Sequence, residues 1–448
     1  MSLSTPLPLP YEARDVALVL GGGGFKGSYQ IGVFDALRLL GIRAGFVCGT
    51  SVGALNAALY ALGAFREAED LWAHLTLSDL VADGVLTQAE KTEAVMARPD
   101  KLLELVAKYG KQKGLDVSPL RTLIRKYAPE DRLRASPVAY GLTVTRLNGL
   151  TQTEKLLPEM AEGSLADWLM ASCACFPAFP LQEIGGELYA DGGFCDNVPV
   201  GMALRRGARH VIAVDVGKHR AHTRYDRRPN VTYIRASRPL GTLLGFDPER
   251  AVFNRILGRN DALRAFQALA GSSYSFDPRD AAKCGEAARS YVEEVSRLEA
   301  MLTPGKAVRL NSAEPSPFFR PLEESAHGAR GEIGYWIRAC ELACDLAGLS
   351  PLPVYTMSSL RDALSEALPL KEARALVGRI PESAAALFTK PKLSRKLAVT
   401  TMACQIMKNG ADAPLLLHAA GSSPKEFLTA LLLCRLFGPA LSPSPEAL

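Results

Sequence analysis

A serine between two glycines is the residue in this sequence best placed to do chemistry. The motif G-x-S-x-G occupies residues 49–53, between an apolar run predicted to be a strand (residues 45–48) and an apolar stretch with helical spacing. In that context the motif is typical of a tight turn that exposes the serine Oγ as a nucleophile. Gly49 and Gly53 are expected because a Cβ at either position would clash in the turn. Ser51 is therefore a candidate catalytic nucleophile.

A second glycine motif lies upstream and predicts a site for negative charge. The apolar run 16–20 is too short for a helix and suits a strand buried on both faces of a parallel sheet, and the glycine-rich loop 21–27 follows it. A helical pattern begins after the loop, so its N–H groups lie where a helix dipole favours an anion. The N–H groups of Gly22, Gly23 and Gly24 are candidates to hold either a nucleotide phosphate or the oxyanion of an acyl-transfer intermediate.

The same loop also matches a dinucleotide-binding fingerprint, through Gly22, Gly24 and Gly27. A dinucleotide site requires an acidic residue about 20 positions further on, at the end of the second strand. The G-x-S-x-G turn stands there instead, which favours acyl transfer and leaves a nucleotide-binding regulator as an alternative. Lys26 is expected to brace the loop or to contact a phosphate rather than to take part in the chemistry.

A nucleophilic serine needs a base, and Asp191 offers one after a predicted strand at residues 187–190. With Asp191-Gly192-Gly193 the sequence carries three motifs in an order that resembles the patatin-like phospholipases. The signatures of that family are a G-G-G-x-[KR]-G oxyanion loop, a G-x-S-x-G turn and a D-G-[GA] triplet.

The resemblance extends to segments 171–180 and 196–200 and covers about residues 14–265. It implies a lipid acyl hydrolase that acts on lipid or fatty-acyl esters through a Ser51–Asp191 dyad, without a histidine. Neither a metal nor another cofactor is expected. The residues that complete the three motifs are Lys26, Gly27, Gly49, Gly53, Gly192 and Gly193.

The expected mechanism follows from these residue types. Ser51 attacks the ester carbonyl while Asp191 accepts its proton, and the glycine loop holds the oxyanion. Asp191 then protonates the leaving alcohol and activates water to release the fatty acid. A carboxyl has an ordinary pKa of about 3.9, and partial desolvation would raise it toward the working range.

Other interpretations of the same residues remain open. Asp191 could cap a turn, since Asp-Gly is common in turns. A conventional triad could use a later histidine, and the candidates are His210, His219, His222, His327 and His418. The chain could also be a catalytically weak scaffold that acts as a binding or regulatory protein through its C-terminal region.

Composition limits the partners. Lys and Arg number 52 against 47 Asp and Glu, a net charge of +5. This mild excess would assist peripheral contact with an anionic membrane but does not call for nucleic acid.

The nine cysteines form an odd set without zinc-ribbon spacing, so reduced buried thiols and a cytoplasmic protein are expected. Neither a secretory signal nor a run of about 20 apolar residues is found. The sequence does not indicate an oligomeric state.

Alternating strands and helices predict an α/β fold with a mainly parallel sheet flanked by helices, a three-layer arrangement that the patatin resemblance also implies. We expect a catalytic domain at residues 14–278 and an all-α region of unknown role at residues 279–448.

Three segments allow two interpretations each. The insertion at 64–135 is a lid or an ordinary helical layer, and Phe176 and Phe179 line an acyl pocket or pack in the core. The basic segment 218–228 is a solvated loop or a headgroup contact.

Overall fold

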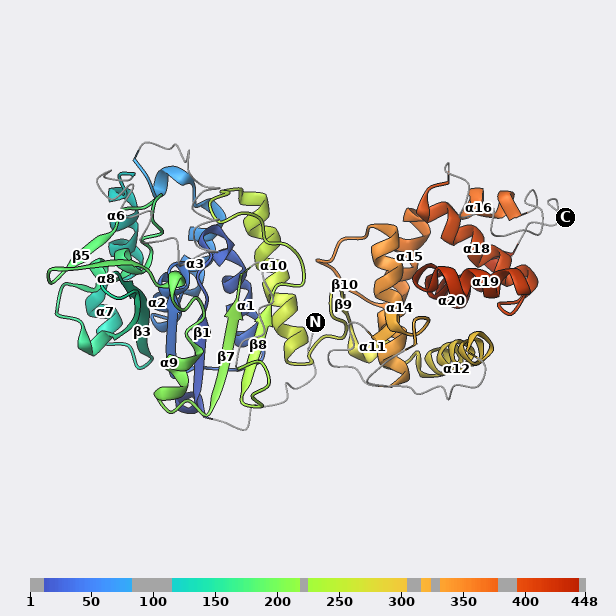
Figure 1. Cartoon of the computed structure of the whole chain (residues 1–448), viewed down its shortest axis with the longest axis horizontal. Coiled ribbons are helices and arrows are strands. Elements are labelled where there is room, and N and C mark those ends of the chain that lie inside the picture. Colours follow the sequence, from blue (N-terminus) through green and yellow to red (C-terminus); the bar gives the residue numbers. More distant parts are fainter. Residues whose placement is uncertain are drawn as a thin grey trace. The chain divides into compact units, whose positions relative to one another are not determined.

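The computed structural model divides the chain into two compact units, Met1–Phe266 and Gln267–Leu448 (Figure 1). It describes residues 12–82, 115–217, 225–303, 316–323, 331–377 and 393–442. The sequence placed the boundary after residue 278. The structure places it earlier because strand β9 (Ser275–Phe276) pairs with strand β10 (Val354–Tyr355) inside the second unit.

The first unit is built on a mixed sheet in the order β5-β6-β3-β2-β1-β7-β8, with β4 paired to β3. Its strands are β1 (Val16–Leu20), β2 (Phe46–Thr50), β3 (Ala139–Arg146), β4 (Thr151–Leu156), β5 (Gln182–Ile184), β6 (Glu187–Asp191), β7 (His210–Asp215) and β8 (Val231–Arg235). Strands β3, β2, β1, β7 and β8 are parallel neighbours, whereas β4, β5 and β6 join through antiparallel pairs. The predicted mainly parallel sheet is confirmed.

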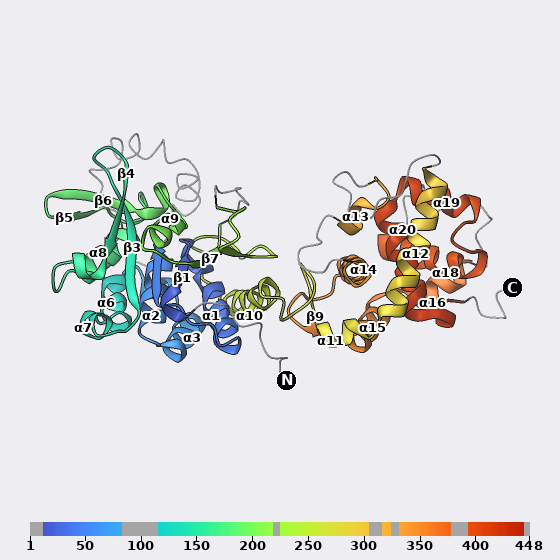
Figure 2. The same ribbon diagram turned by 90° about the horizontal axis from the view of Figure 1, so that it is seen from below.

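Helices cover both faces of this sheet (Figure 2). The helices are α1 (Ser28–Leu39), α2 (Val52–Ala61), α3 (Phe65–His74), α6 (Ser118–Tyr127), α7 (Glu130–Arg134), α8 (Leu165–Ser172), α9 (Val200–Arg205) and α10 (Pro248–Ala265). Strand β1 shows why two layers are needed, because all five of its residues are buried. Ala17 and Val19 pack in one cluster with Val200 and Met202 of α9, and the intervening residues face the helices of the other layer.

The second unit is helical. Its helices are α11 (Pro278–Ala282), α12 (Gly285–Leu302), α13 (Arg320–Glu323), α14 (Glu332–Ala347), α15 (Met357–Ala367), α16 (Leu370–Val377), α18 (Arg395–Asn409), α19 (Pro414–Ser422) and α20 (Pro424–Phe437). Trp336 of α14 meets Tyr291 of α12 edge to face, with ring centroids 5.9 Å apart, in a core that these helices share. The predicted helical character of this region is confirmed, and β9 and β10 add one short pair of parallel strands to it.

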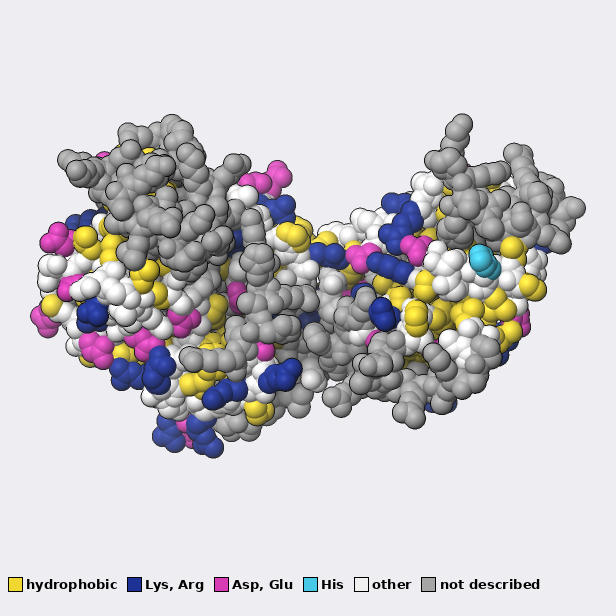
Figure 3. Space-filling model, viewed as in Figure 1, with side chains coloured by type: hydrophobic (Ala, Val, Ile, Leu, Met, Phe, Trp, Pro, Cys, Tyr) yellow, Lys and Arg dark blue, Asp and Glu magenta, His cyan; other side chains and the backbone are white. Residues whose placement is uncertain are grey.

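Some predicted features lie outside the described residues: 83–114 of the insertion, 218–224 of the basic segment, and 378–392. Within the described chain, no helix is both long and apolar enough to cross a membrane. On the face shown in Figure 3, basic and acidic side chains of the first unit are interspersed, and hydrophobic side chains gather on the second unit.

A buried carboxylate secures the start of the second unit. Glu341, on α14, is 1% exposed. It accepts hydrogen bonds from the backbone N–H groups of Ser272 at 2.6 Å, Ser273 at 2.7 Å and Tyr274 at 3.2 Å. Arg338 donates to it at 3.2 Å and supplies the opposite charge. One side chain therefore accepts the hydrogen bonds of a loop whose backbone N–H groups would otherwise be buried without an acceptor.

We expect Glu341→Gln to destabilise the second unit by about 2–4 kcal/mol. The amide loses the charge-assisted hydrogen bonds, and its NH₂ group faces N–H groups that are themselves donors. Urea unfolding of the whole chain measures this loss. Glu332→Gln, at the start of the same helix, is the matched control: its carboxylate lies 3.5 Å from Arg289 and is 45% exposed. An exposed ion pair contributes at most about 1 kcal/mol. Equal losses in the two variants would contradict the anchoring role.

Candidate functional site

Ser51 lies at the sharp turn between β2 and α2, in a backbone conformation that few side chains adopt. Its φ is 55° and its ψ is −129°. A Cβ on Gly49 would lie 2.3 Å from the Gly53 carbonyl carbon, and one on Gly53 would lie 2.2 Å from the Leu20 oxygen. The expected clash at both glycines is confirmed. The turn brings the start of α2 against the end of β1 and beside the first glycines of the loop.

Asp191 ends strand β6 and is fully buried. Its Oδ1 accepts a hydrogen bond from the Gly193 N–H at 2.8 Å. Its Oδ2 is buried, and no donor in the described part of the chain forms a hydrogen bond of standard geometry with it. Burial raises the pKa of this carboxyl from 3.8 to about 7, against the lowering effects of the neighbouring Ser51 hydroxyl and the Gly193 N–H. At neutral pH the group can therefore both accept and return a proton.

Ser51 and Asp191 line one small apolar cavity of about 70 Å³. Leucine and aromatic side chains make up most of its wall, and α3 and α6 of the predicted insertion contribute to it. These two helices supply Leu71, Trp72, Leu120 and Leu123.

The structure separates the two phenylalanines that the sequence could not distinguish. Phe179 lines the cavity, whereas Phe176 packs with Ala190 and Phe194 in a separate core cluster. Cys173 and Cys175 also line the cavity, a contribution that the sequence analysis did not anticipate. Burial raises the pKa of both thiols, so they are protonated at neutral pH.

The glycine loop differs from expectation at one of its three donors. The Gly22 N–H donates to the Asn197 carbonyl at 3.1 Å and is therefore already engaged. For Gly23 and Gly24 the described chain offers no acceptor, and Gly24, at φ 57°, lines the Ser51 cavity. Val52, the first residue of α2, also carries an N–H without an intrahelical partner and lines the cavity. The candidate donors are thus Gly23, Gly24 and Val52.

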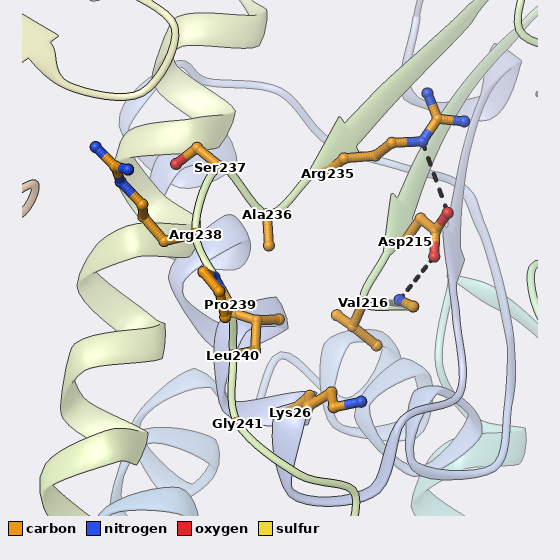
Figure 4. Close-up of a pocket in the computed structure, with 11 residues that line it drawn as sticks. Lys26, Asp215, Val216, Arg235, Ala236, Ser237, Arg238, Pro239, Leu240 and Gly241 are labelled. Atoms are coloured by element: carbon orange, nitrogen blue, oxygen red, sulfur yellow. Dashed lines mark hydrogen bonds and ion pairs between the residues drawn. The ribbon is translucent and has the colours of Figure 1, made fainter. Parts of the chain in front are cut away.

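Lys26 lies outside the wall of the Ser51 cavity. It is buried and lines a second cavity of about 430 Å³, together with the ends of β7 and β8 and the segment that follows (Figure 4). Across this cavity Asp215 lies 3.6 Å from the Arg235 Nε and accepts the Gly217 N–H at 2.9 Å. Lys26 is therefore absent from the residues that line the Ser51 cavity, and its role in bracing the loop or contacting a phosphate stays a prediction.

No described histidine lines the cavity of Ser51. His210 lies in β7 with its Nε2 3.0 Å from Thr232 Oγ1, and burial lowers its pKa. His219, His222 and His327 fall outside the described residues. Within the described ranges, no cluster of three His, Cys, Asp or Glu residues is arranged to hold a metal ion.

The buried carboxyl makes stability depend on pH. Between its ordinary pKa of 3.8 and its folded-state pKa of about 7, Asp191 is ionised when unfolded and protonated when folded, so folding is progressively disfavoured as pH rises through this range. We compare the unfolding free energy of Asp191→Asn with that of the wild type at each pH. The difference in favour of the variant should grow by on the order of 4 kcal/mol between about pH 4 and about pH 8. Urea unfolding at several pH values measures the difference. Asp70→Asn, at an exposed position, should show no such trend; a constant offset for Asp191→Asn would contradict the raised pKa.

The part of the chain that carries this site is similar in sequence to known proteins. Residues 18–204 match the model of the patatin-like phospholipase family. Patatin-like phospholipase domain-containing protein 6 of Mus musculus is 28% identical over 204 residues, which are 45% of this chain and 13% of that protein. Lysophospholipase NTE1 of Meyerozyma guilliermondii is 26% identical over 209 residues, which are 45% of this chain and 12% of that protein. The chain thus spans only a small part of the length of these relatives.

Two solved structures of bacterial proteins are also similar to the chain. VipD from Legionella pneumophila has 14% sequence identity and a TM-score of 0.39, covering 96% of this chain and 93% of that chain. ExoU from Pseudomonas aeruginosa, in complex with SpcU, has 16% identity and a TM-score of 0.33, covering 91% and 87%. The similarity to the family is carried by the sequence match: residues 18–204, which contain the glycine loop, Ser51 and Asp191, match the patatin-like phospholipase family.

Proposed function

We propose that the first unit is a lipid acyl hydrolase in which Ser51 is the nucleophile and Asp191 the general base. The observation that carries the proposal is the placement of both residues on one apolar cavity, with the pKa of Asp191 raised to about 7 by burial. A carboxyl in that range can take a proton from an attacking hydroxyl and return it to a leaving group. The names of the relatives, phospholipase and lysophospholipase, support a lipid ester as substrate.

In the first half-reaction Ser51 Oγ bonds to the ester carbonyl carbon as its proton passes to Asp191. The carbonyl oxygen gains negative charge, and the N–H groups of Gly23, Gly24 and Val52 are the candidates to stabilise it. One such donor typically lowers a barrier by about 3 kcal/mol. Collapse of this intermediate breaks the ester C–O bond, and Asp191 gives its proton to the departing alcohol.

In the second half-reaction the ionised Asp191 takes a proton from water, and the resulting hydroxide attacks the acyl-enzyme carbonyl. The bond to Ser51 Oγ then breaks, the fatty acid leaves, and the serine regains its proton. The apolar wall of the cavity would hold the acyl chain, since it offers few polar partners to water. We place the reaction in the cytoplasm, at the surface of a membrane or lipid aggregate.

We expect Ser51→Ala and Asp191→Asn each to abolish hydrolysis of a short-chain chromogenic ester and of phospholipid vesicles, in the presence of EDTA. The wild-type kcat/KM should fall as pH is lowered through about 7, because only ionised Asp191 acts as the base. Ser78→Ala and Asp70→Asn make the same chemical changes outside the cavity and should leave activity unchanged.

These assays separate the alternatives. Activity retained in Asp191→Asn would show that another group is the base. A folded wild type that is inert on both substrates would favour a binding role for the domain. Loss of activity in EDTA would point to a metal-dependent reaction.

The two phenylalanines test whether this cavity holds the acyl chain. We expect Phe179→Leu to raise the rate on long-chain relative to short-chain esters several-fold, because a smaller side chain widens the cavity, and one extra methylene in a pocket changes discrimination by about 1–3 kcal/mol. Phe176→Leu removes the same atoms from a core cluster outside the cavity and should change stability but not the chain-length profile. Equal shifts in both variants would place the acyl chain elsewhere.

A further inference from the structure

The backbone N–H of Ser51 is held by a side chain from a distant part of the sequence. It donates to Ser172 Oγ at 2.8 Å, and the Ser172 hydroxyl in turn donates to the Thr143 carbonyl at 2.9 Å. Ser172 is the last residue of α8 and is fully buried. Because Thr143 receives its proton, the Ser172 oxygen presents a lone pair to Ser51.

The same short segment also holds the candidate base. The Asp191 N–H donates to the Ala174 carbonyl at 3.0 Å, two residues beyond Ser172. On the other side, Thr145 Oγ1 donates to the Asp191 carbonyl at 2.9 Å. Thr143 and Thr145 are neighbours on one face of β3, so the nucleophile and the base are fixed to the same two elements, β3 and the end of α8.

We propose that Ser172 is a positioning residue for the hydrolysis: its Oγ holds the Ser51 backbone so that the Ser51 hydroxyl faces the Asp191 carboxyl. This inference depends on the proposed function of the dyad. In the proposed mechanism the proton passes directly from the Ser51 hydroxyl to the Asp191 carboxyl, and the two groups are close enough for the hydroxyl to lower the pKa of the carboxyl. A displacement of about 1 Å in such a geometry costs up to about 10²-fold in rate. The positive φ of Ser51 is a second reason why its backbone must be held, because a strained backbone relaxes unless its surroundings prevent it.

The decisive variant is Ser172→Ala, compared with Ser172→Cys and Tyr140→Phe. The thiol of Ser172→Cys keeps a weak acceptor at the same place. Tyr140 is the matched control: its buried hydroxyl donates at 3.0 Å to the Ala54 carbonyl of α2 and does not reach Ser51. Losing that bond weakens the packing of the same helix without releasing the Ser51 N–H.

We expect kcat on the chromogenic ester to fall about tenfold to 10²-fold in Ser172→Ala, with less than about a twofold change in KM. Ser172→Cys should lie between this variant and the wild type, and Tyr140→Phe should match the wild type. The lower limb of the kcat/KM profile should move to higher pH in Ser172→Ala, because the Ser51 hydroxyl no longer lowers the pKa of Asp191. Equal kcat and pH profiles in Ser172→Ala and Tyr140→Phe would overturn the proposal.

Amide hydrogen exchange gives a readout that does not require turnover. The Ser51 amide should exchange faster in Ser172→Ala than in Tyr140→Phe at matched global stability, since only the first variant removes its acceptor. Unchanged exchange at Ser51 would overturn the positioning role even in an active enzyme. If exchange rises as expected while the wild type hydrolyses no ester, Ser172 still holds the Ser51 backbone, and the proposed function is what fails.

Discussion

The left-handed backbone at Ser51 is the constraint on which the rest of the first unit depends. A non-glycine residue in this region is strained by about 1–3 kcal/mol and persists only where its neighbours prevent relaxation. Here the neighbours are close: a Cβ on Gly53 would lie 2.2 Å from the Leu20 oxygen, and one on Gly22 would lie 3.1 Å from the Ser51 Cβ. The glycine loop is therefore beside Ser51 because β1 and β2 are adjacent parallel strands that end at the same edge of the sheet.

The buried carboxyl of Asp191 illustrates how function and stability oppose each other at this edge. An exposed aspartate would be too weak a base near neutral pH, and burial corrects this by disfavouring the charged form. The same desolvation makes the folded state less stable above the ordinary pKa of the group. Hydrogen bonds to the backbone on both sides of the residue, from Thr145 and to Ala174, keep the strand in place although its side chain opposes folding at neutral pH.

Local motifs predict the parts of this protein that depend on local geometry. The glycines around Ser51 and the strand before Asp191 were predictable because a tight turn and a short apolar run each leave a signal within a few residues. Helix α18 leaves a weaker signal in the sequence, because Val399, Thr400 and Thr401 lower helix propensity and burial on several sides removes the amphipathic period.

Hydrogen bonds between residues far apart in the sequence explain what the motifs could not predict. The Gly22 N–H is engaged by Asn197, and the Ser51 N–H by Ser172, across sequence separations that no motif records.

The glycine loop forms part of the wall of two different cavities, although it is a single motif in the sequence. Gly24 and Phe25 line the cavity of Ser51, and Lys26, the next residue, lines the second cavity beside β7 and β8. The segment after β8 follows the same path, since residues 240–241 line the second cavity and residues 243–244 line the cavity of Ser51. The Phe25 N–H donates to the Leu243 carbonyl at 2.9 Å and fastens the two segments together. The loop that carries the candidate oxyanion donors therefore cannot shift toward one cavity without moving the wall of the other.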